Sequence, residues 1–78
     1  MIMKQQHEIR SEVRRFRLNA AMTQQDLATK IGVTRQTVVA IEKGNYTPSV
    51  ALALQLALVF QVRVEDLFQL ASGKSTDV

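Results

Sequence analysis

The stretch TQQDLATKIGVTRQTVVAIEKG, residues 23–44, contains the start and stop signals of two short helices separated by a tight turn. In its first half, Thr23 and Asp26 have the spacing of a helix N-cap and an acidic third residue, which is close to a capping box. Gly32 ends that helix, because glycine adopts the left-handed C-terminal conformation without strain. The first half therefore predicts a helix between Thr23 and Gly32.

The second half repeats the same signals. Thr34 can cap a helix from Arg35 to Lys43, which Gly44 ends in the same manner. Two short helices joined by a glycine-containing turn form a helix-turn-helix, whose second helix fits a DNA major groove about 12 Å wide. Because such pairs are also common in plain helical bundles, the spacing alone supports DNA binding only weakly.

The side chains of this second helix favour the DNA-binding interpretation. Val38 and Ile41 fall on one side, which predicts burial, with Thr37 and Glu42 at its edges. The opposite side carries no acid and is centred on Val39, which is unusual for a helix face in water. Arginine can bind guanine and glutamine adenine through two hydrogen bonds each, and small apolar groups can meet a thymine methyl.

Two sets of candidate DNA contacts follow. The candidate base readers are Arg35, Gln36, Val39 and Ala40. The candidate phosphate or positioning contacts are Thr23, Gln24, Thr34, Thr37, Lys43 and Asn45. Free backbone N–H groups at the start of the preceding helix add to this phosphate-binding character. The alternative is that Thr34 only caps the helix and that Arg35 and Gln36 are solvated surface.

Helical spacing also occurs outside this stretch, whereas strand alternation is nearly absent. We expect a first helix over residues 8–20, a fourth from residues 47–49 to about Phe60, and a fifth from about Val64 to Leu70. The sequence thus predicts an all-α, five-helix domain over residues 8–70. A flexible N-terminal arm (1–7) and a flexible tail (71–78) are expected on either side of it.

The composition, with 46% hydrophobic and 22% charged residues, is that of an ordinary globular domain. There is no cysteine and a single histidine, His7, so neither a metal site nor a cofactor is expected. Residues 10–43 carry seven Lys and Arg against three acids, which indicates either a face for a polyanion or a solvated surface.

Residues 44–62 contain no charged residue, which calls for a test of membrane insertion. The apolar part, from Val50 to Val62, has 13 residues, whereas a membrane span needs about 20. A buried helix is therefore expected instead. We expect no membrane association and a cytoplasmic protein that binds DNA in the nucleoid.

This fourth helix is apolar on more than one side. A core stripe is expected from Val50, Ala53, Leu56, Ala57 and Phe60. A helix that is apolar all round is buried on both faces, and a five-helix domain has no second layer to cover it. The sequence therefore predicts a symmetric homodimer, with a monomer of apolar surface as the alternative. The expected interface residues are Leu52, Leu58, Val59, Phe68 and Leu70.

The combination of TQ-x-x-LA, G-V-x-RQT and IEKG-x-Y-x-PS resembles the Cro/CI-type helix-turn-helix family, the lambda-repressor-like DNA-binding domains, over residues 23–68. The short stand-alone bacterial regulators of that family are most similar. The resemblance implies a five-helix domain whose third helix lies in the major groove, usually as a homodimer on a two-fold-related operator. It further implies that Gln24 binds phosphate and braces the reading helix, and that Arg17 and Glu42 form a structural ion pair.

The sequence departs from the family pattern at four positions. Ala21 and Gln61 stand where the family has glycine, and Arg63 replaces a Ser or Thr cap before the fifth helix. Left-handed backbone at Ala21 would cost about 1 kcal/mol. Ala40 occupies a place where relatives often carry a polar reader, so fewer bases would be read directly.

We conclude from the sequence that the protein is a sequence-specific transcriptional regulator that binds double-stranded DNA. A repressor is favoured, because blocking a promoter needs no activation surface. The alternative is an antitoxin-type protein-interaction module that also represses its own operon, which an adjacent toxin-like reading frame would favour. Enzyme activity is not expected, because His7 is isolated and Glu65 and Asp66 are explained as favourable charges at a helix N-terminus.

Overall fold

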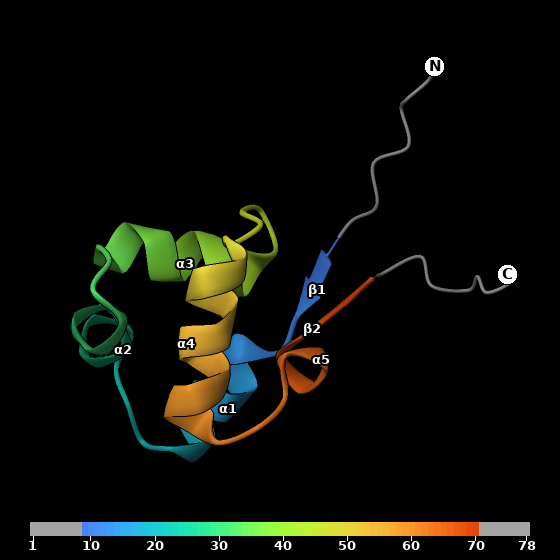
Figure 1. The fold of residues 1–78 in the computed structure, drawn as a ribbon. Coiled ribbons are helices and arrows are strands. Elements are labelled where there is room, and N and C mark those ends of the chain that lie inside the picture. Colours follow the sequence, from blue (N-terminus) through green and yellow to red (C-terminus); the bar gives the residue numbers. More distant parts are fainter. Residues whose placement is uncertain (1–8, 71–78) are drawn as a thin grey trace, which may run out of the picture.

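The computed structural model describes residues 9–70 and contains five helices and one pair of short strands (Figure 1). The expected arm (1–7) and tail (71–78) lie outside the described residues. The elements are β1 (Ile9–Ser11), α1 (Val13–Asn19), α2 (Gln24–Ile31), α3 (Arg35–Lys43), α4 (Val50–Phe60), α5 (Val64–Leu67) and β2 (Phe68–Leu70).

The helix-turn-helix forms as expected, because its local signals are all satisfied. The Thr23 hydroxyl accepts a hydrogen bond from the Asp26 N–H, and the Asp26 carboxylate accepts one from the Thr23 N–H, both at 2.9 Å. The Thr34 hydroxyl accepts the N–H of Thr37 at 3.2 Å. Gly32, with a φ of 75°, ends α2 in the left-handed conformation.

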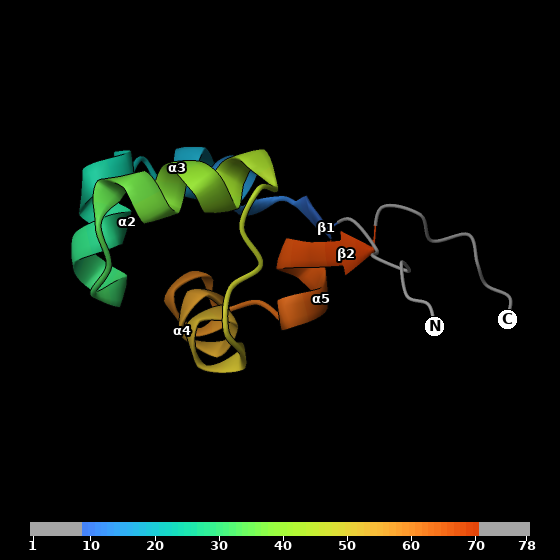
Figure 2. The same cartoon turned by 90° about the horizontal axis from the view of Figure 1, so that it is seen from above.

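The helices pack around a small apolar core. In Figure 1, α3 crosses one end of α4, while α1 lies behind α4. Seen from above in Figure 2, α3 is nearest the viewer, and no other helix or strand of residues 9–70 covers it. The largest fully buried side chains come from all five helices: Val13, Leu27, Val38, Ile41, Leu56 and Leu67. Within residues 9–70, no helix is long and apolar enough to cross a membrane.

The expected ends of the first and fifth helices were wrong, because a strand pair replaces them. Helix α1 begins at Val13 and α5 ends at Leu67, while β1 pairs antiparallel with β2 so that Ile9 faces Leu70. The N–H of Glu12 donates to the Leu67 carbonyl at 2.8 Å, which continues the pairing up to the start of α1. The two ends of the domain are therefore joined to each other.

The burial of α4 corrects part of the expected core and interface. Leu52, expected at a dimer interface, is only 8% exposed and belongs to the core. Val50, expected in the core, is 77% exposed. Ala53, Leu56 and Ala57 are buried as expected. The buried side of α4 is thus rotated from the expected one, since the helix sequence has no polar face to fix it.

The family departures are accommodated without glycine. Ala21 and Gln61 have φ values of 58° and 57°, so both adopt the left-handed conformation that glycine takes without strain. The chain between α1 and α2 therefore turns at an alanine. At the start of α5, the Asp66 carboxylate accepts the N–H of Arg63 at 3.0 Å, and the Asp66 N–H, which a cap hydroxyl would accept, donates to the Arg63 carbonyl at 2.9 Å.

Candidate DNA interface

Helix α3 presents the expected side chains on its uncovered side. Arg35 and Gln36 are exposed in its first turn, and Val39 and Ala40 are half-buried in the second. Val38 and Ile41 lie beneath them in the core, with 0% and 1% exposure. The burial pattern of α3 therefore leaves the candidate base readers on a side that an outside molecule can approach.

The start of α3 is held in place by two threonine hydroxyls. Thr34 caps the helix, and its Oγ1 lies 3.1 Å from the Oγ1 of Thr37. Thr34 is exposed and Thr37 is half-buried. This contact fixes the first turn, from which Arg35 and Gln36 project.

A buried ion pair ties α1 to α3. The Arg17 guanidinium donates from Nε and Nη2 to the two carboxylate oxygens of Glu42, the Nη2 contact at 3.2 Å. Its Nη1 donates to the Met22 carbonyl at 2.8 Å. The side chains of Arg17 and Glu42 are 8% and 4% exposed. The ion pair that the resemblance implies is therefore present and sheltered from water.

Gln24 extends this network toward the start of α2. Its amide nitrogen donates to Glu42 Oε1 at 3.2 Å, so the α2 N-terminus is braced against α3. The hydrogen bond that the Arg17 side chain donates to Glu42 raises the pKa of Arg17 above its ordinary value, and the Coulombic attraction between the two side chains acts in the same direction. Glu42, the acid of α3, is therefore neutralised inside the protein and is not presented on the uncovered side.

The other candidate phosphate contacts lie at the ends of α2 and α3. Thr23 is exposed at the cap of α2, where hydrogen bonds from its backbone N–H and its hydroxyl hold the pKa of Asp26 below the ordinary value. Lys43 and Asn45 are exposed at the end of α3, and the Asn45 N–H donates to the Ala40 carbonyl at 3.0 Å. The start of α2 and the end of α3 thus both offer hydrogen-bond donors.

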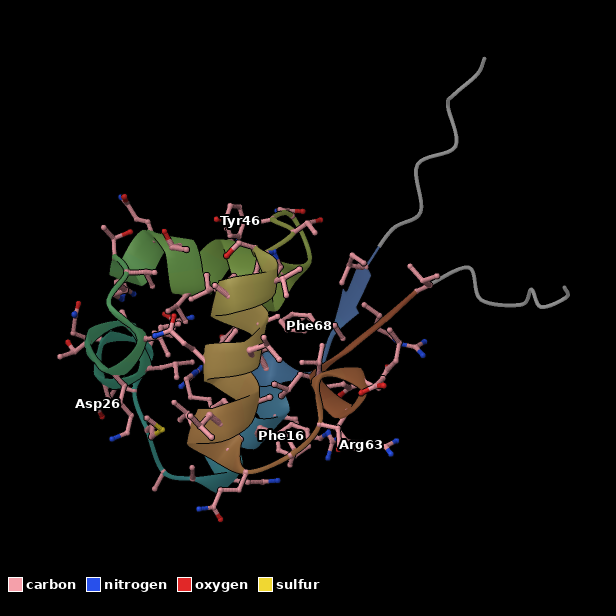
Figure 3. The ribbon with its side chains drawn as sticks, viewed as in Figure 1. Phe16, Asp26, Tyr46, Arg63 and Phe68 are labelled. Carbon is pink, nitrogen blue, oxygen red and sulfur yellow. The ribbon has the colours of Figure 1, made fainter. Side chains whose placement is uncertain are left out.

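Tyr46 is a candidate that the sequence reasoning did not assign to DNA. It follows Gly44 by two residues, is 42% exposed, and lies beside the C-terminal end of α3 (Figure 3). The signal was available, since an aromatic residue stands in the polar loop directly after the reading helix. Its hydroxyl gives this end of α3 another possible hydrogen-bond donor.

The basic side chains of residues 10–43 are spread over β1, α1, α2 and α3, and one of them is buried. Arg17 is buried, Arg14 and Arg15 are exposed on α1, and Lys30 is exposed at the end of α2. The cations on α3 are Arg35 and Lys43, with no exposed acid on the same helix. The positive charge that α3 itself exposes therefore comes from two side chains close to the candidate base readers.

A second exposed feature is the apolar face of α4, formed by Val50, Leu54 and Leu58. These residues recur every four positions and are 77%, 57% and 77% exposed. Of the expected interface residues, Leu58 lies on this face, Leu70 is 51% exposed, and Val59 and Phe68 are half-buried. The sequence did not predict that Leu54 and Val50 are exposed on this face, because the buried side of α4 was expected elsewhere.

A family model described as helix-turn-helix matches residues 13–67. An uncharacterized HTH-type transcriptional regulator from Archaeoglobus fulgidus is 52% identical over 60 residues, which cover 77% of this chain and 86% of the relative. The uncharacterized HTH-type transcriptional regulator YgzD from Bacillus subtilis is 44% identical over 62 residues, covering 80% of this chain and 94% of YgzD.

Two solved structures are similar in fold. The SOS-response transcriptional repressor LexA from Eubacterium rectale superimposes with a TM-score of 0.68 at 26% identity, covering 85% of this chain and 70% of that one. The restriction-modification controller protein C.AhdI from Aeromonas hydrophila gives a TM-score of 0.64 at 28% identity, covering 72% and 81%.

Proposed function

Because this chain belongs to the helix-turn-helix family of DNA-binding transcriptional regulators, we propose that it represses transcription by binding a two-fold-related operator as a homodimer. Residues 8–70 would carry both DNA binding and dimerisation. The observation that carries the proposal is the uncovered side of α3, where Arg35 and Gln36 are exposed and the acid Glu42 is withdrawn into a buried ion pair.

The reading set combines two polar and two apolar side chains. Arg35 can donate two hydrogen bonds to guanine O6 and N7, and Gln36 can pair with adenine N6 and N7. Val39 and Ala40, half-buried one turn further along, are suited to a thymine methyl group. Four neighbouring residues would therefore specify a short half-site.

Phosphate contacts on either side would fix the register of α3 in the groove. At the α2 N-terminus these are Thr23, Gln24 and free backbone N–H groups, and at the start of α3 they are Thr34 and Thr37. Lys43, Asn45 and Tyr46 would contact the backbone at the other end of α3. Gln24 would serve twice, because its amide nitrogen already braces α3 through Glu42.

Dimerisation supplies the second half-site. The exposed apolar face of α4 supports this step, because contiguous exposed apolar surface on a small domain marks an association site. Two copies related by a two-fold axis would place their α3 helices in successive major grooves about 34 Å apart. A regulator bound in this way acts as a repressor by covering promoter DNA, which requires no further surface.

Selection of bound sequences from a random pool of double-stranded DNA tests this proposal. We expect enrichment of two half-sites related by two-fold symmetry, with centres about 10 base pairs apart. Enriched sites without symmetry would contradict the homodimer. A pool that gains no common sequence would contradict sequence-specific binding itself.

A further inference from the structure

A hollow of about 180 Å³ lies beside the exposed apolar face of α4, between the strand pair, the loop before α4, and α5. Ala53 lies at this hollow, and Ile9, Leu54 and Phe68 form part of its lining. None of the charged side chains within residues 9–70 lines it. The hollow is therefore suited to an apolar side chain from outside the protomer.

We propose that Leu58 of a second copy fills this hollow, so that each protomer inserts one leucine into the other. The proposal rests on the homodimer proposed above and names its central contact. Leu58 is 77% exposed and does not line the hollow of its own chain. Within residues 9–70, each protomer therefore carries both a hollow that no side chain fills and an exposed side chain that could fill one.

The spacing along α4 makes the two features complementary. A two-fold axis through Leu54 and perpendicular to α4 would set the two α4 helices antiparallel, and in a two-fold interface residue i meets j where j meets i. Val50 and Leu58 lie four residues before and after Leu54, about 6 Å along the helix in each direction. Leu58 of one copy would then lie opposite Val50 of the other, and Val50 lines the hollow.

Size and charge agree with this occupant. An apolar cavity of about 150 Å³ accommodates a benzene molecule, so the hollow has room for the four side-chain carbons of leucine. Helix α4 contains no charged residue over Val50–Phe60, so the two helices themselves bring no like charges together. A second copy of this chain thus provides both the side chain and an uncharged helix to pack beside the hollow.

Two complementary changes test the contact by sedimentation equilibrium. Leu58→Ala removes the inserted side chain, and Thr47→Phe fills the hollow from its exposed edge within the same chain. We expect each variant alone to raise the dimer Kd at least about tenfold, because apolar burial is lost at both symmetric contacts. Ala53→Leu fills the same hollow from its other side and is expected to act like Thr47→Phe.

Mixing the two kinds of variant gives the decisive result. The filled chain still supplies Leu58 and the Leu58→Ala chain still offers an open hollow, so we expect the heterodimer to be tighter than either variant homodimer. Leu18→Ala, at a 51% exposed leucine on α1, is the matched control and should leave the dimer unchanged. Circular dichroism melts confirm that each variant is folded.

The outcomes separate this proposal from the homodimer itself. A monomeric parent protein at concentrations well above operator binding would contradict the homodimer. A dimeric parent whose Kd is unchanged by all three variants would retain the homodimer and overturn the leucine contact. Weakened variants that form no tighter heterodimer when mixed would overturn it as well.

Discussion

Arg17 links α1 to α3 through the buried carboxylate of Glu42. Replacing Glu42 with alanine would leave this guanidinium buried without its partner, which typically costs about 3–5 kcal/mol. We therefore expect Glu42→Ala to lower the free energy of unfolding by about that amount in urea denaturation.

The exposed pair of Arg15 and Glu12 provides the control for this change. The Arg15 Nε and Glu12 Oε1 atoms are 3.1 Å apart, but the side chains of Arg15 and Glu12 are 57% and 30% exposed. Arg15 also lies over the Phe16 ring, 4.6 Å from its centroid. Arg15→Ala should cost about 1 kcal/mol or less. Equal losses for the two variants would show that the Arg17–Glu42 pair does not hold the helices together.

A second residue-scale prediction concerns Ala21, whose φ is 58°. Glycine relieves the left-handed strain of about 1 kcal/mol but adds freedom to the unfolded chain. We expect Ala21→Gly to stabilise the protein by up to about 1 kcal/mol in urea denaturation. Ala20→Gly, at a φ of −91°, should destabilise it instead. The same sign for both changes would refute the strain at Ala21.

At the scale of elements, Gly44 does more than end α3. A Cβ at this position would lie 3.0 Å from the Ile9 carbonyl oxygen, so β1 rests against the end of α3. A Cβ at Gly32 would meet nothing within 4 Å, although its φ of 75° is similar to the 80° of Gly44. A side chain at Gly32 would therefore meet backbone strain alone, whereas one at Gly44 would meet backbone strain and a steric contact.

Alanine at each glycine measures this difference. Both changes place a Cβ on left-handed backbone, which lowers the free energy of unfolding by about 1–2 kcal/mol. Gly44→Ala should cost about 1 kcal/mol more, because the β1 backbone must shift. Thermal or urea unfolding of the two variants checks the ranking. A Gly32→Ala variant that is the less stable of the two would argue against the contact between β1 and α3.

The sequence predicted those parts of the fold that are determined by neighbouring residues and missed those that depend on residues far apart in the chain. The capping box at Thr23, the cap at Thr34 and the left-handed glycines were correct because each signal lies within a few residues of the structure it determines. The strand pair was missed because Ile9 and Leu70 are partners from opposite ends of the domain. Strands of three residues are also too short to show alternation.

The candidate sites divide in the same way. On α3 the apolar residues Val38 and Ile41 fall on one side and the polar Arg35 and Gln36 on the other, so the burial of Val38 and Ile41 followed from the sequence. On α4 almost every residue is apolar, and Leu52 and Leu54 could not be distinguished without the packing of the other helices. The interface prediction therefore included Leu52, which is buried in the core, and left out Leu54, which is exposed.

On the scale of the whole molecule, the proposed surfaces for reading DNA and for self-association belong to neighbouring helices. Replacing Leu54 and Leu58 together with glutamate puts charges on the apolar face of α4 and should yield a folded monomer by light scattering. Leu18→Glu on α1 is the control and should remain dimeric. Leu52→Glu should unfold the protein, because Leu52 is 8% exposed. An unchanged dimer mass for the double variant would move the interface elsewhere.

The measurement that tests the account most directly compares Gln36→Ala on two DNAs, the site selected from the random pool and an unselected sequence of the same length. If α3 reads base edges, the variant binds the selected site about 1–3 kcal/mol more weakly and binds the unselected DNA with unchanged affinity. Gln55→Ala, the same chemical change at an exposed position of α4, should alter neither affinity. Equal losses on both DNAs would show that Gln36 does not read bases and would contradict the placement of α3 in the major groove.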